Sequence, residues 1–268
     1  MRPLSHLQPL PFSSVSSNAQ LHMTRFHFKR SKFILLCSST QPNSATEAGS
    51  ASGPDSKPGL LDNLFLNLFR KKMVEEIGWD SKKPGYDGLI EVANRLMIGR
   101  TNSETNDAAV RILRSLFPPF LLELYRMLIT PIGGGRLAAM MVARVTALTC
   151  PWLMGPCMVN SINHPDGSSC KSGVFVERCK YLVESKCVGI CVNTCKLPTQ
   201  TFFKDYMGIP LLMEPNFSDY SCQFNFGVPP PPTENDGTLK EPCLEICPNA
   251  SRRREAISKT NAKPCVKS

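Results

Sequence analysis

The sequence contains very little histidine. Only four of its 268 residues are His, and three of them, His6, His22 and His27, precede the first acidic residue, Glu47. From Glu47 onward only His164 remains. A site that takes two or more histidines from one chain, such as a catalytic zinc site or the facial triad of a non-haem iron oxygenase, is therefore excluded from that part of the sequence.

Acidic side chains are absent from residues 1–46, which contain five basic residues and nine serines. A basic, serine-rich and acid-free start is typical of an organellar transit peptide, and its Ser and Pro content favours the chloroplast over the mitochondrion. The apolar run at 33–37 is too short for a secretory signal. We predict a chloroplast transit peptide at 1–46, followed by a small, polar, disordered linker at 47–58.

The transit peptide carries five of the nine net positive charges of the chain. Nucleic-acid binding needs a persistent basic face on the mature domain, so a nucleic-acid partner is not expected. The remaining basic run, within residues 249–268, is predicted to be a solvated, disordered tail.

Long hydrophobic runs are also missing. The longest uncharged stretch, residues 145–163, contains two prolines and several polar side chains, so no transmembrane segment is predicted. Methionines are frequent between 140 and 158. They favour core packing, with peripheral contact with plastid membranes as the alternative.

Helical periodicity dominates residues 59–150. Apolar stripes occur at Leu61–Leu68, Leu89–Met97, Val110–Phe117, Leu121–Leu128 and Leu137–Cys150. Thr101 and Glu104 have capping-box spacing, and Pro118-Pro119 ends one helix and starts the next. The triglycine 133–135 has no preceding strand and no following Gly-Lys-Ser/Thr, so it predicts a hinge or turn and not a phosphate loop.

Residues 151–248 have a different pattern, with short β-like segments at 174–176, 210–213 and 223–226 between cysteines and turns. We therefore expect an α+β fold in which the helical N-terminal part packs on a smaller, cysteine-rich α+β part.

Eight of the twelve cysteines lie between 170 and 247: Cys170, Cys179, Cys187, Cys191, Cys195, Cys222, Cys243 and Cys247. A spacing of four residues places successive thiols one helical turn apart, and converging thiolates suit iron or zinc. However, standard zinc and ferredoxin motifs contain C-x2-C pairs, whereas these are C-x3-C. Metal binding, a redox dithiol and buried inert thiols remain three open interpretations.

The other polar candidates are weaker. His164 stands in the turn sequence Asn-His-Pro-Asp-Gly, so it is interpreted as a loop residue, with a lone ligand or general base as the alternative. A Cys nucleophile would have only this histidine as its base. The carboxylates near the cysteines, Glu177, Glu184, Glu214 and Asp219, are interpreted as solvated surface charges, with a mixed metal site as the alternative.

A long string of residues contains cysteines at regular places. It runs from Glu177-Arg-Cys179 through Cys187-Val-Gly-Ile-Cys191-Val-Asn-Thr-Cys195 to Pro215-Asn-Phe-Ser-Asp-Tyr-Ser-Cys222, and Pro151-Trp-Leu-Met-Gly-Pro-Cys157 extends it. This string resembles the Dwarf-twenty-seven family of plastid iron-containing β-carotene isomerases. The resemblance covers residues 152–247 well and the helical part more loosely.

The resemblance implies a chloroplast cis-trans isomerase that reversibly converts all-trans-β-carotene into the 9-cis isomer, for strigolactone biosynthesis or related carotenoid metabolism. It also implies iron as cofactor, as a cation or an Fe–S cluster. Our hypothesis places the metal on Cys187, Cys191, Cys195 and Cys222, with Cys179, Cys243 and Cys247 as alternative ligands. Catalytic residues are not assigned, and the shared cysteines and Asp219 are candidates. The alternative is a non-catalytic plastid iron–sulfur or redox-regulated thiol protein.

Overall fold

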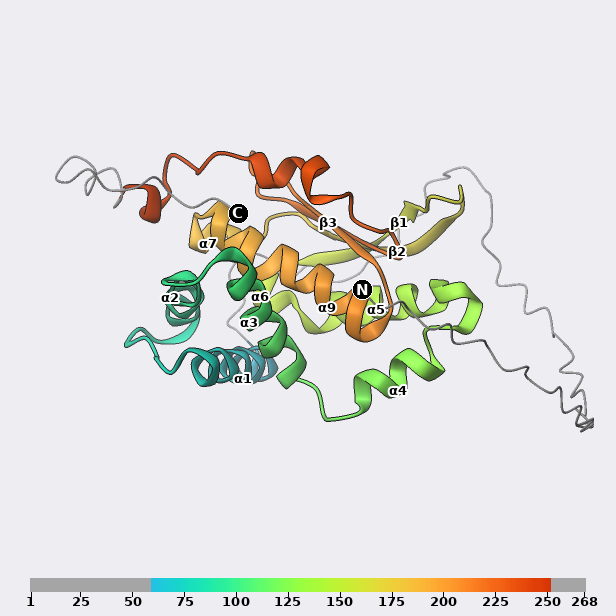
Figure 1. Cartoon of the computed structure of the whole chain (residues 1–268), viewed down its shortest axis with the longest axis horizontal. Helices are drawn as coiled ribbons and strands as arrows, with labels where there is room; N and C mark the ends of the chain where they lie inside the picture. Colours follow the sequence, from blue (N-terminus) through green and yellow to red (C-terminus); the bar gives the residue numbers. More distant parts are fainter. Residues whose placement is uncertain (1–58, 252–268) are drawn as a thin grey trace, which may run out of the picture. The chain divides into compact units, whose positions relative to one another are not determined.

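A computed structural model describes residues 59–251 of the chain (Figure 1). The predicted transit peptide and linker lie outside these residues, as does the tail from residue 252 onward. The first three helices are α1 (Leu60–Ile77), α2 (Gly85–Met97) and α3 (Asn102–Ser115). The predicted capping box is confirmed at the start of α3, where Thr101 Oγ1 accepts from the Glu104 backbone and Glu104 accepts from the Thr101 backbone.

The two prolines separate α3 from α4 (Leu121–Leu128), as the sequence predicts. The triglycine forms a turn, η1 (Ile132–Gly135), in which all three glycines have positive φ. That conformation is disfavoured for residues with a Cβ, which explains the run of glycine. The chain then enters α5 (Arg136–Thr149) and α6 (Pro151–Met154).

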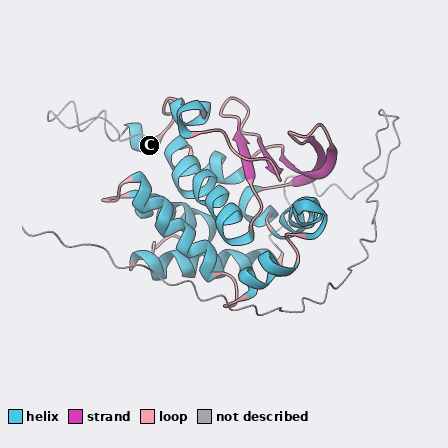
Figure 2. Ribbon diagram, turned by 45° about the vertical axis from the view of Figure 1, so that its right-hand side comes forward, coloured by secondary structure: helices cyan, strands magenta, loops and turns pink. Residues whose placement is uncertain are grey.

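The sheet has the strand order β1-β2-β4-β3 and is antiparallel throughout. Its strands are β1 (Cys157–Asn163), β2 (Ser169–Val176), β3 (Leu211–Pro215) and β4 (Cys222–Phe226). The three segments predicted as β-like are strands, whereas β1 was not predicted. Helix α5 packs against β2, and α9 (Leu197–Met207) packs against β3. Figure 2 distinguishes the helices from the strands of the sheet by colour.

The cysteine-rich region joins the two halves of the sheet. It contains α7 (Lys180–Ser185), α8 (Val188–Ile190) and a π-helical turn, η2 (Cys191–Lys196), which leads directly into α9. After β4, two 3₁₀ turns, η3 (Thr233–Asn235) and η4 (Gly237–Lys240), follow the proline run. The mixture of helices with one antiparallel sheet confirms the α+β prediction.

Two groups of buried side chains form the hydrophobic interior. The sheet-side core contains Val174, Phe202, Leu211 and Phe226 together with Ala138 of α5. The helix-side core is built mainly from α1, α2 and α3, but it also contains Tyr181, Cys187 and Cys247 from the cysteine-rich region. Cys179 and Cys195 pack against both cores, so the cysteine-rich region lies where they meet.

The face that α1 buries differs from the predicted stripe. Leu61, Leu64 and Leu68 are exposed, whereas Met73 is buried and Phe69 packs against the helix-side core. Phe65, the fourth residue of that stripe, stacks on Trp152 with ring centroids 6.4 Å apart. The aromatic contacts to Trp152 therefore set the rotation of α1, and the leucines are turned outward.

Candidate functional site

Four cysteines from three separate segments form a thiol cluster, defined here as Cys179, Cys191, Cys195 and Cys222. Each thiol of the cluster lies within electrostatic range of at least one other, and Cys191 lies within range of the remaining three. Cys222 belongs to the sheet-side core, Cys179 and Cys195 pack against both cores, and Cys191 is buried. The cluster therefore lies in an apolar environment between the two.

Secondary structure brings these cysteines together. Cys179 caps the start of α7, and its backbone N–H donates to the Tyr220 carbonyl at 2.7 Å. Cys191 and Cys195 belong to the π-helical turn η2. Cys222 is the first residue of β4 and pairs with Val176 and Pro215 of the neighbouring strands. Turns of π-helix are rare and occur frequently at functional sites.

Burial keeps the cluster protonated at neutral pH. It raises the pKa of the Cys195 thiol to about 12, with a further contribution from the nearby Cys179 thiol. Burial, followed by repulsion from neighbouring thiols, also raises the pKa of Cys191 and of Cys222 well above the ordinary value. The thiolate is the nucleophile and the metal ligand, so each thiol must lose its proton before it reacts or binds.

A buried cation lies beside the cluster. Lys196 ends η2 with only 1% of its surface exposed, and its Nζ donates to Asp236 Oδ2 at 2.5 Å and to the Thr238 hydroxyl. Its charge lowers the pKa values of Cys191 and Cys222, in opposition to burial. Burial raises the pKa of Asp236, but the bonds from Lys196 and Thr238 outweigh it and leave that pKa below the ordinary value.

Cys187 lies away from the other three residues of the hypothesised metal set. Its thiol interacts with Cys247 and accepts from Asn249 Nδ2 at 3.6 Å, and both cysteines belong to the helix-side core. Cys187 has extended backbone angles, φ −140° and ψ 114°, because it precedes α8. As the N-cap of α8, Cys187 still accepts a helical bond at its carbonyl from the Cys191 backbone at 3.1 Å, so the helix itself is not broken there. The thiols nevertheless have different partners, so we call Cys187 and Cys247 the thiol pair and treat it separately.

Two tyrosines near the cluster are neutral. Burial raises the pKa of Tyr181 and of Tyr86, and the hydroxyls bond to Thr194 Oγ1 at 2.8 Å and to the Leu153 carbonyl at 2.5 Å. Asn193, in the same turn as Cys191, has a buried side-chain oxygen without a hydrogen-bond partner among the described residues. Such an atom is rare in native structures and marks a position that a further ligand could satisfy.

The donor chemistry of the cluster suits iron, since thiolates are the ligands of Fe–S centres. The geometry does not yet enclose an ion: within residues 59–251, no three His, Cys, Asp or Glu side chains are arranged to hold a metal. Iron binding by these thiols thus requires deprotonation and a closer approach of the sulfur atoms, and no chemical step is derived through iron here.

The carboxylates predicted to be surface charges are exposed: Glu177, Glu184, Glu214 and Asp219. Asp219 accepts from the Ser221 backbone at 2.8 Å, which lowers its pKa, and it stabilises the turn before β4. His164 is a loop residue, as predicted, and its Nε2 lies 2.9 Å from Ser172 Oγ.

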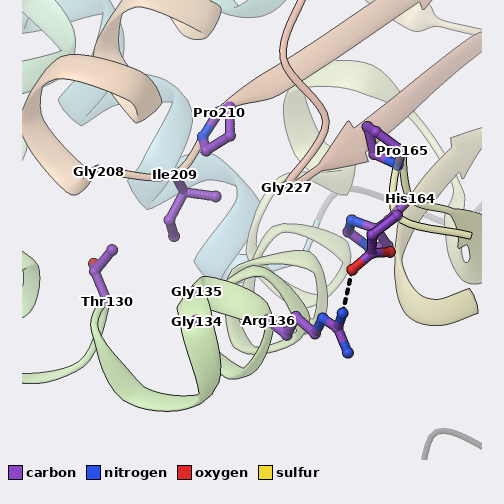
Figure 3. Close-up of a pocket in the computed structure, with 11 residues that line it drawn as sticks. Thr130, Gly134, Gly135, Arg136, His164, Pro165, Gly208, Ile209, Pro210 and Gly227 are labelled. Carbon is purple, nitrogen blue, oxygen red and sulfur yellow. Dashed lines mark hydrogen bonds and ion pairs between the residues drawn. The ribbon is translucent and has the colours of Figure 1, made fainter. Parts of the chain in front are cut away.

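A cavity of about 390 Å³ lies at the bend between α4 and α5, where Thr130, Arg136, His164 and Ile209 line its wall (Figure 3). Arg136 forms an ion pair with Asp166 across it, and hydrogen bonds from Ser168, together with this pair, lower the pKa of Asp166 to about 2. Gly227, which directly follows β4, also lines the cavity. Cys222 begins that strand, so the cavity and the cluster are about 17 Å apart along it.

Lys196, Asp236, Tyr181 and Asn193 were not predicted as site residues. The sequence contains one signal for the lysine, which is the only charged residue between Lys186 and Lys204. A single cation in an otherwise apolar run indicates a buried, paired side chain. Its partner lies 40 residues away, and no local pattern indicates it.

Comparison with known proteins places this site in a family. A family profile described as "Beta-carotene isomerase D27-like, C-terminal" matches residues 152–235, which include the whole thiol cluster. A Medicago truncatula protein named "Beta-carotene isomerase D27, chloroplastic" is 34% identical over 191 residues, which cover 71% of this chain and 74% of that protein. An Arabidopsis thaliana protein of the same name is 30% identical over 203 residues, with 75% coverage of each chain. No solved structure matches.

The fold and the site define a thiol-rich α+β protein with a single histidine among residues 59–251. The chain belongs to the β-carotene isomerase D27-like family, which confirms the resemblance seen in the sequence. It is a chloroplast protein, as predicted, because both relatives are named chloroplastic.

Proposed function

We propose that this protein is a carotenoid cis-trans isomerase that converts all-trans-β-carotene reversibly into 9-cis-β-carotene, for strigolactone biosynthesis or related carotenoid metabolism. The observation that carries the proposal is the similarity to two proteins named beta-carotene isomerase over about three quarters of their length. The matched residues include all four cysteines of the thiol cluster and Lys196.

We further propose that the cluster binds iron, either as a cation or as an Fe–S centre. Rotation about a double bond requires a transient loss of its π order, and a redox-active iron centre supplies one-electron chemistry of that kind. The proposed iron ligands are Cys191, Cys195 and Cys222 of the original hypothesis, together with Cys179, which was an alternative ligand there. Cys187 is left out because it contacts Cys247.

The protein side chains have three roles in this proposal. The apolar side chains of the two cores exclude water from the cluster, and they favour a hydrocarbon substrate that has no polar group. The Lys196 ammonium group lowers the cost of ionising Cys191 and Cys222. Asp236 and Thr238 hold that ammonium group in place, so the C-terminal turn η4 contributes to the site.

A rod-shaped hydrocarbon substrate needs an elongated apolar binding site. The cavity at the α4–α5 bend is lined mainly by glycines, prolines and polar residues, so it does not resemble such a site. Of the methionines between 140 and 158, Met154 is buried in the sheet-side core, whereas Met141 and Met158 are exposed.

The test is anaerobic incubation of the purified, iron-loaded protein with all-trans-β-carotene and, separately, with the 9-cis isomer, followed by chromatography. Both reactions should approach the same isomer ratio. If both ratios stay at their starting values while iron remains bound, the isomerase proposal is wrong.

A second candidate is a non-catalytic plastid iron–sulfur or redox-regulated thiol protein. It is favoured by the contact between Cys187 and Cys247, two thiols that lie close enough to form a hydrogen bond. In that case the incubation would leave both carotenes unchanged, and mild oxidation would link the thiol pair.

A further inference from the structure

Helix α4 presents an unusual amount of apolar surface. Five large apolar side chains within nine residues are exposed, and Phe120 and Met127 have 79% and 67% of their surface accessible. The group, which we call the α4 face, consists of Phe120, Leu121, Leu124, Met127 and Leu128. Contiguous apolar patches of this kind mark sites of interaction with proteins or membranes.

The other side of α4 is firmly attached to the protein. Leu122 is buried in the sheet-side core, and the Tyr125 hydroxyl donates to the Ala138 carbonyl at 3.2 Å. Arg126 Nη1 donates to the Asp205 carbonyl at 2.9 Å, and Thr130 Oγ1 to the Met207 carbonyl at 2.7 Å. The exposed face therefore belongs to an anchored helix, and fraying does not account for it.

Charge around the α4 face is mainly positive, although the exposed Glu123 lies on α4 itself and Arg136 is paired with Asp166. No Asp or Glu occurs between Glu123 and Asp166, whereas that stretch contains Arg126, Arg136 and Arg144. Arg144 lies on the exposed side of α5. Exposed apolar side chains in a stretch that carries three arginines and one glutamate are complementary to a lipid surface that contains anionic headgroups.

Among the described residues, no single helix is long and apolar enough to cross a membrane. Helix α4 and the segment Ile132–Thr149 meet the criterion of length and composition only when they are taken together, and the two are bent by 111° relative to each other. Helix α4 has eight residues and is about 12 Å long, far shorter than a bilayer core. The inner side of α5, including Ala138, Ala139 and Val142, is buried in the sheet-side core. This geometry suits a helix that lies in the membrane interface.

We propose that the α4 face docks the protein on the surface of a lipid bilayer, with its apolar side chains inserted at the boundary between headgroups and acyl chains. The choice of a bilayer over a second protein copy rests on the proposed carotenoid substrate, which dissolves in lipid and not in water. Docking brings the α4–α5 bend and the cavity beside it to the membrane surface.

The test is flotation of the full chain with vesicles of phosphatidylcholine containing about one third phosphatidylglycerol. All samples carry glutamine at Arg25, Lys29, Arg30 and Lys32, so that the basic N-terminal segment does not dominate binding. The test variant is L121Q/L124Q/L128Q. The matched control is L61Q/L64Q/L68Q, which removes three exposed leucines from α1, where three acidic residues are balanced by three basic ones.

We expect the α4 variant to float about tenfold less than the parent chain, whereas the α1 control floats as the parent does. Arg144→Gln should reduce binding to the anionic vesicles by about fivefold. Equal loss in the α1 and α4 variants, or no flotation of the parent chain, would overturn the proposal. So would a parent dimer in the absence of lipid that becomes a monomer in the α4 variant.

Activity on detergent-solubilised β-carotene separates this proposal from the proposed function. The α4 variant should retain that activity, since detergent replaces the membrane as the source of substrate. A parent chain that isomerises carotene in detergent but does not float contradicts docking alone. A parent chain that floats but never isomerises carotene contradicts the proposed function and leaves docking supported.

Discussion

The thiol cluster and the thiol pair are both built from buried cysteines, yet their surroundings differ. Around the cluster lie the buried Lys196–Asp236 ion pair, two neutral tyrosines and a π-helical turn. The thiol pair has an amide donor, Asn249, beside Cys187. Cys187 and Cys191 are only four residues apart, so spacing alone does not indicate which thiols meet. The partners of the two thiols separate the groups, because Cys187 interacts with Cys247 and Cys191 with the other cysteines of the cluster.

The largest expected difference between the two groups is in bound iron. In a C191S/C195S variant that still folds, iron per protein should fall at least about tenfold, because two of the four proposed ligands are lost. A C187S/C247S variant should keep its iron. Metal analysis of the anaerobically purified proteins measures both. If C191S/C195S retained its iron, the thiol cluster would not be the metal site.

The ion pair beside the cluster should contribute strongly to stability. Asp236→Asn leaves the Lys196 ammonium group buried without its carboxylate, and the expected loss is about 3–5 kcal/mol in the free energy of unfolding. Urea unfolding at neutral pH measures it. The double variant K196M/D236L should recover most of the loss, because an apolar pair replaces the buried charges. A loss below about 1 kcal/mol in D236N would show that the ion pair is dispensable.

Alkaline pH should destabilise the protein through the thiol cluster and through the thiol pair, over different pH ranges. The pKa of Cys195 is raised from 9.0 to about 12 and that of Cys187 from 9.0 to about 11, in each case chiefly by burial. Above pH 9 the unfolded chain ionises while the folded thiol does not. Each thiol therefore lowers the free energy of unfolding by about 1.4 kcal/mol per pH unit, up to its folded pKa.

Unfolding curves between pH 8 and 12 test this difference. In Cys195→Ala, the free energy of unfolding should fall less steeply with pH than in the wild type from pH 9 to 12. In Cys187→Ala, the same difference should be confined to pH 9 to 11. Identical pH profiles for both variants and the wild type would contradict the assigned pKa shifts.

The smallest expected effect concerns the thiol pair. Asn249 Nδ2 donates to Cys187 Sγ and, at 2.9 Å, to Asn94 Oδ1, so Asn249→Ala should cost about 1 kcal/mol of stability. The hydrogen bond to sulfur lowers the pKa of Cys187, and its loss should therefore slow alkylation of that thiol. Mass spectrometry of iodoacetamide-treated protein measures the rate, and an unchanged rate would show that Asn249 does not control Cys187.

The sequence predicted those parts of the fold whose signals are local. The capping box of α3, the prolines before α4 and the apolar segments that became β2, β3 and β4 all have short-range patterns. Strand β1 was missed because its residues, Cys-Met-Val-Asn-Ser-Ile-Asn, are half polar and only partly buried. The leucine stripes of α1 and α4 misled the prediction, because Phe69 and Leu122 face the interior instead.

The site was predicted in part for the same reason. Three cysteines of the hypothesised metal set, Cys191, Cys195 and Cys222, lie within electrostatic range in the structure, and the metal itself stays a prediction. Cys187 was placed with them on helical spacing, but its thiol interacts with Cys247 instead. The Lys196–Asp236 pair and the contact between Cys187 and Cys247 join residues 40 and 60 positions apart, so tertiary structure alone indicates them.

The most direct test of the central claim, that carotene isomerisation depends on the thiol cluster and not on the thiol pair, is one comparison of rates. Wild type, C191S/C195S and C187S/C247S are incubated anaerobically with all-trans-β-carotene in detergent, and 9-cis-β-carotene is followed by chromatography. We predict that wild type and C187S/C247S form the 9-cis isomer at similar rates, whereas C191S/C195S forms none above background. A C191S/C195S variant that isomerises at the wild-type rate would contradict the claim.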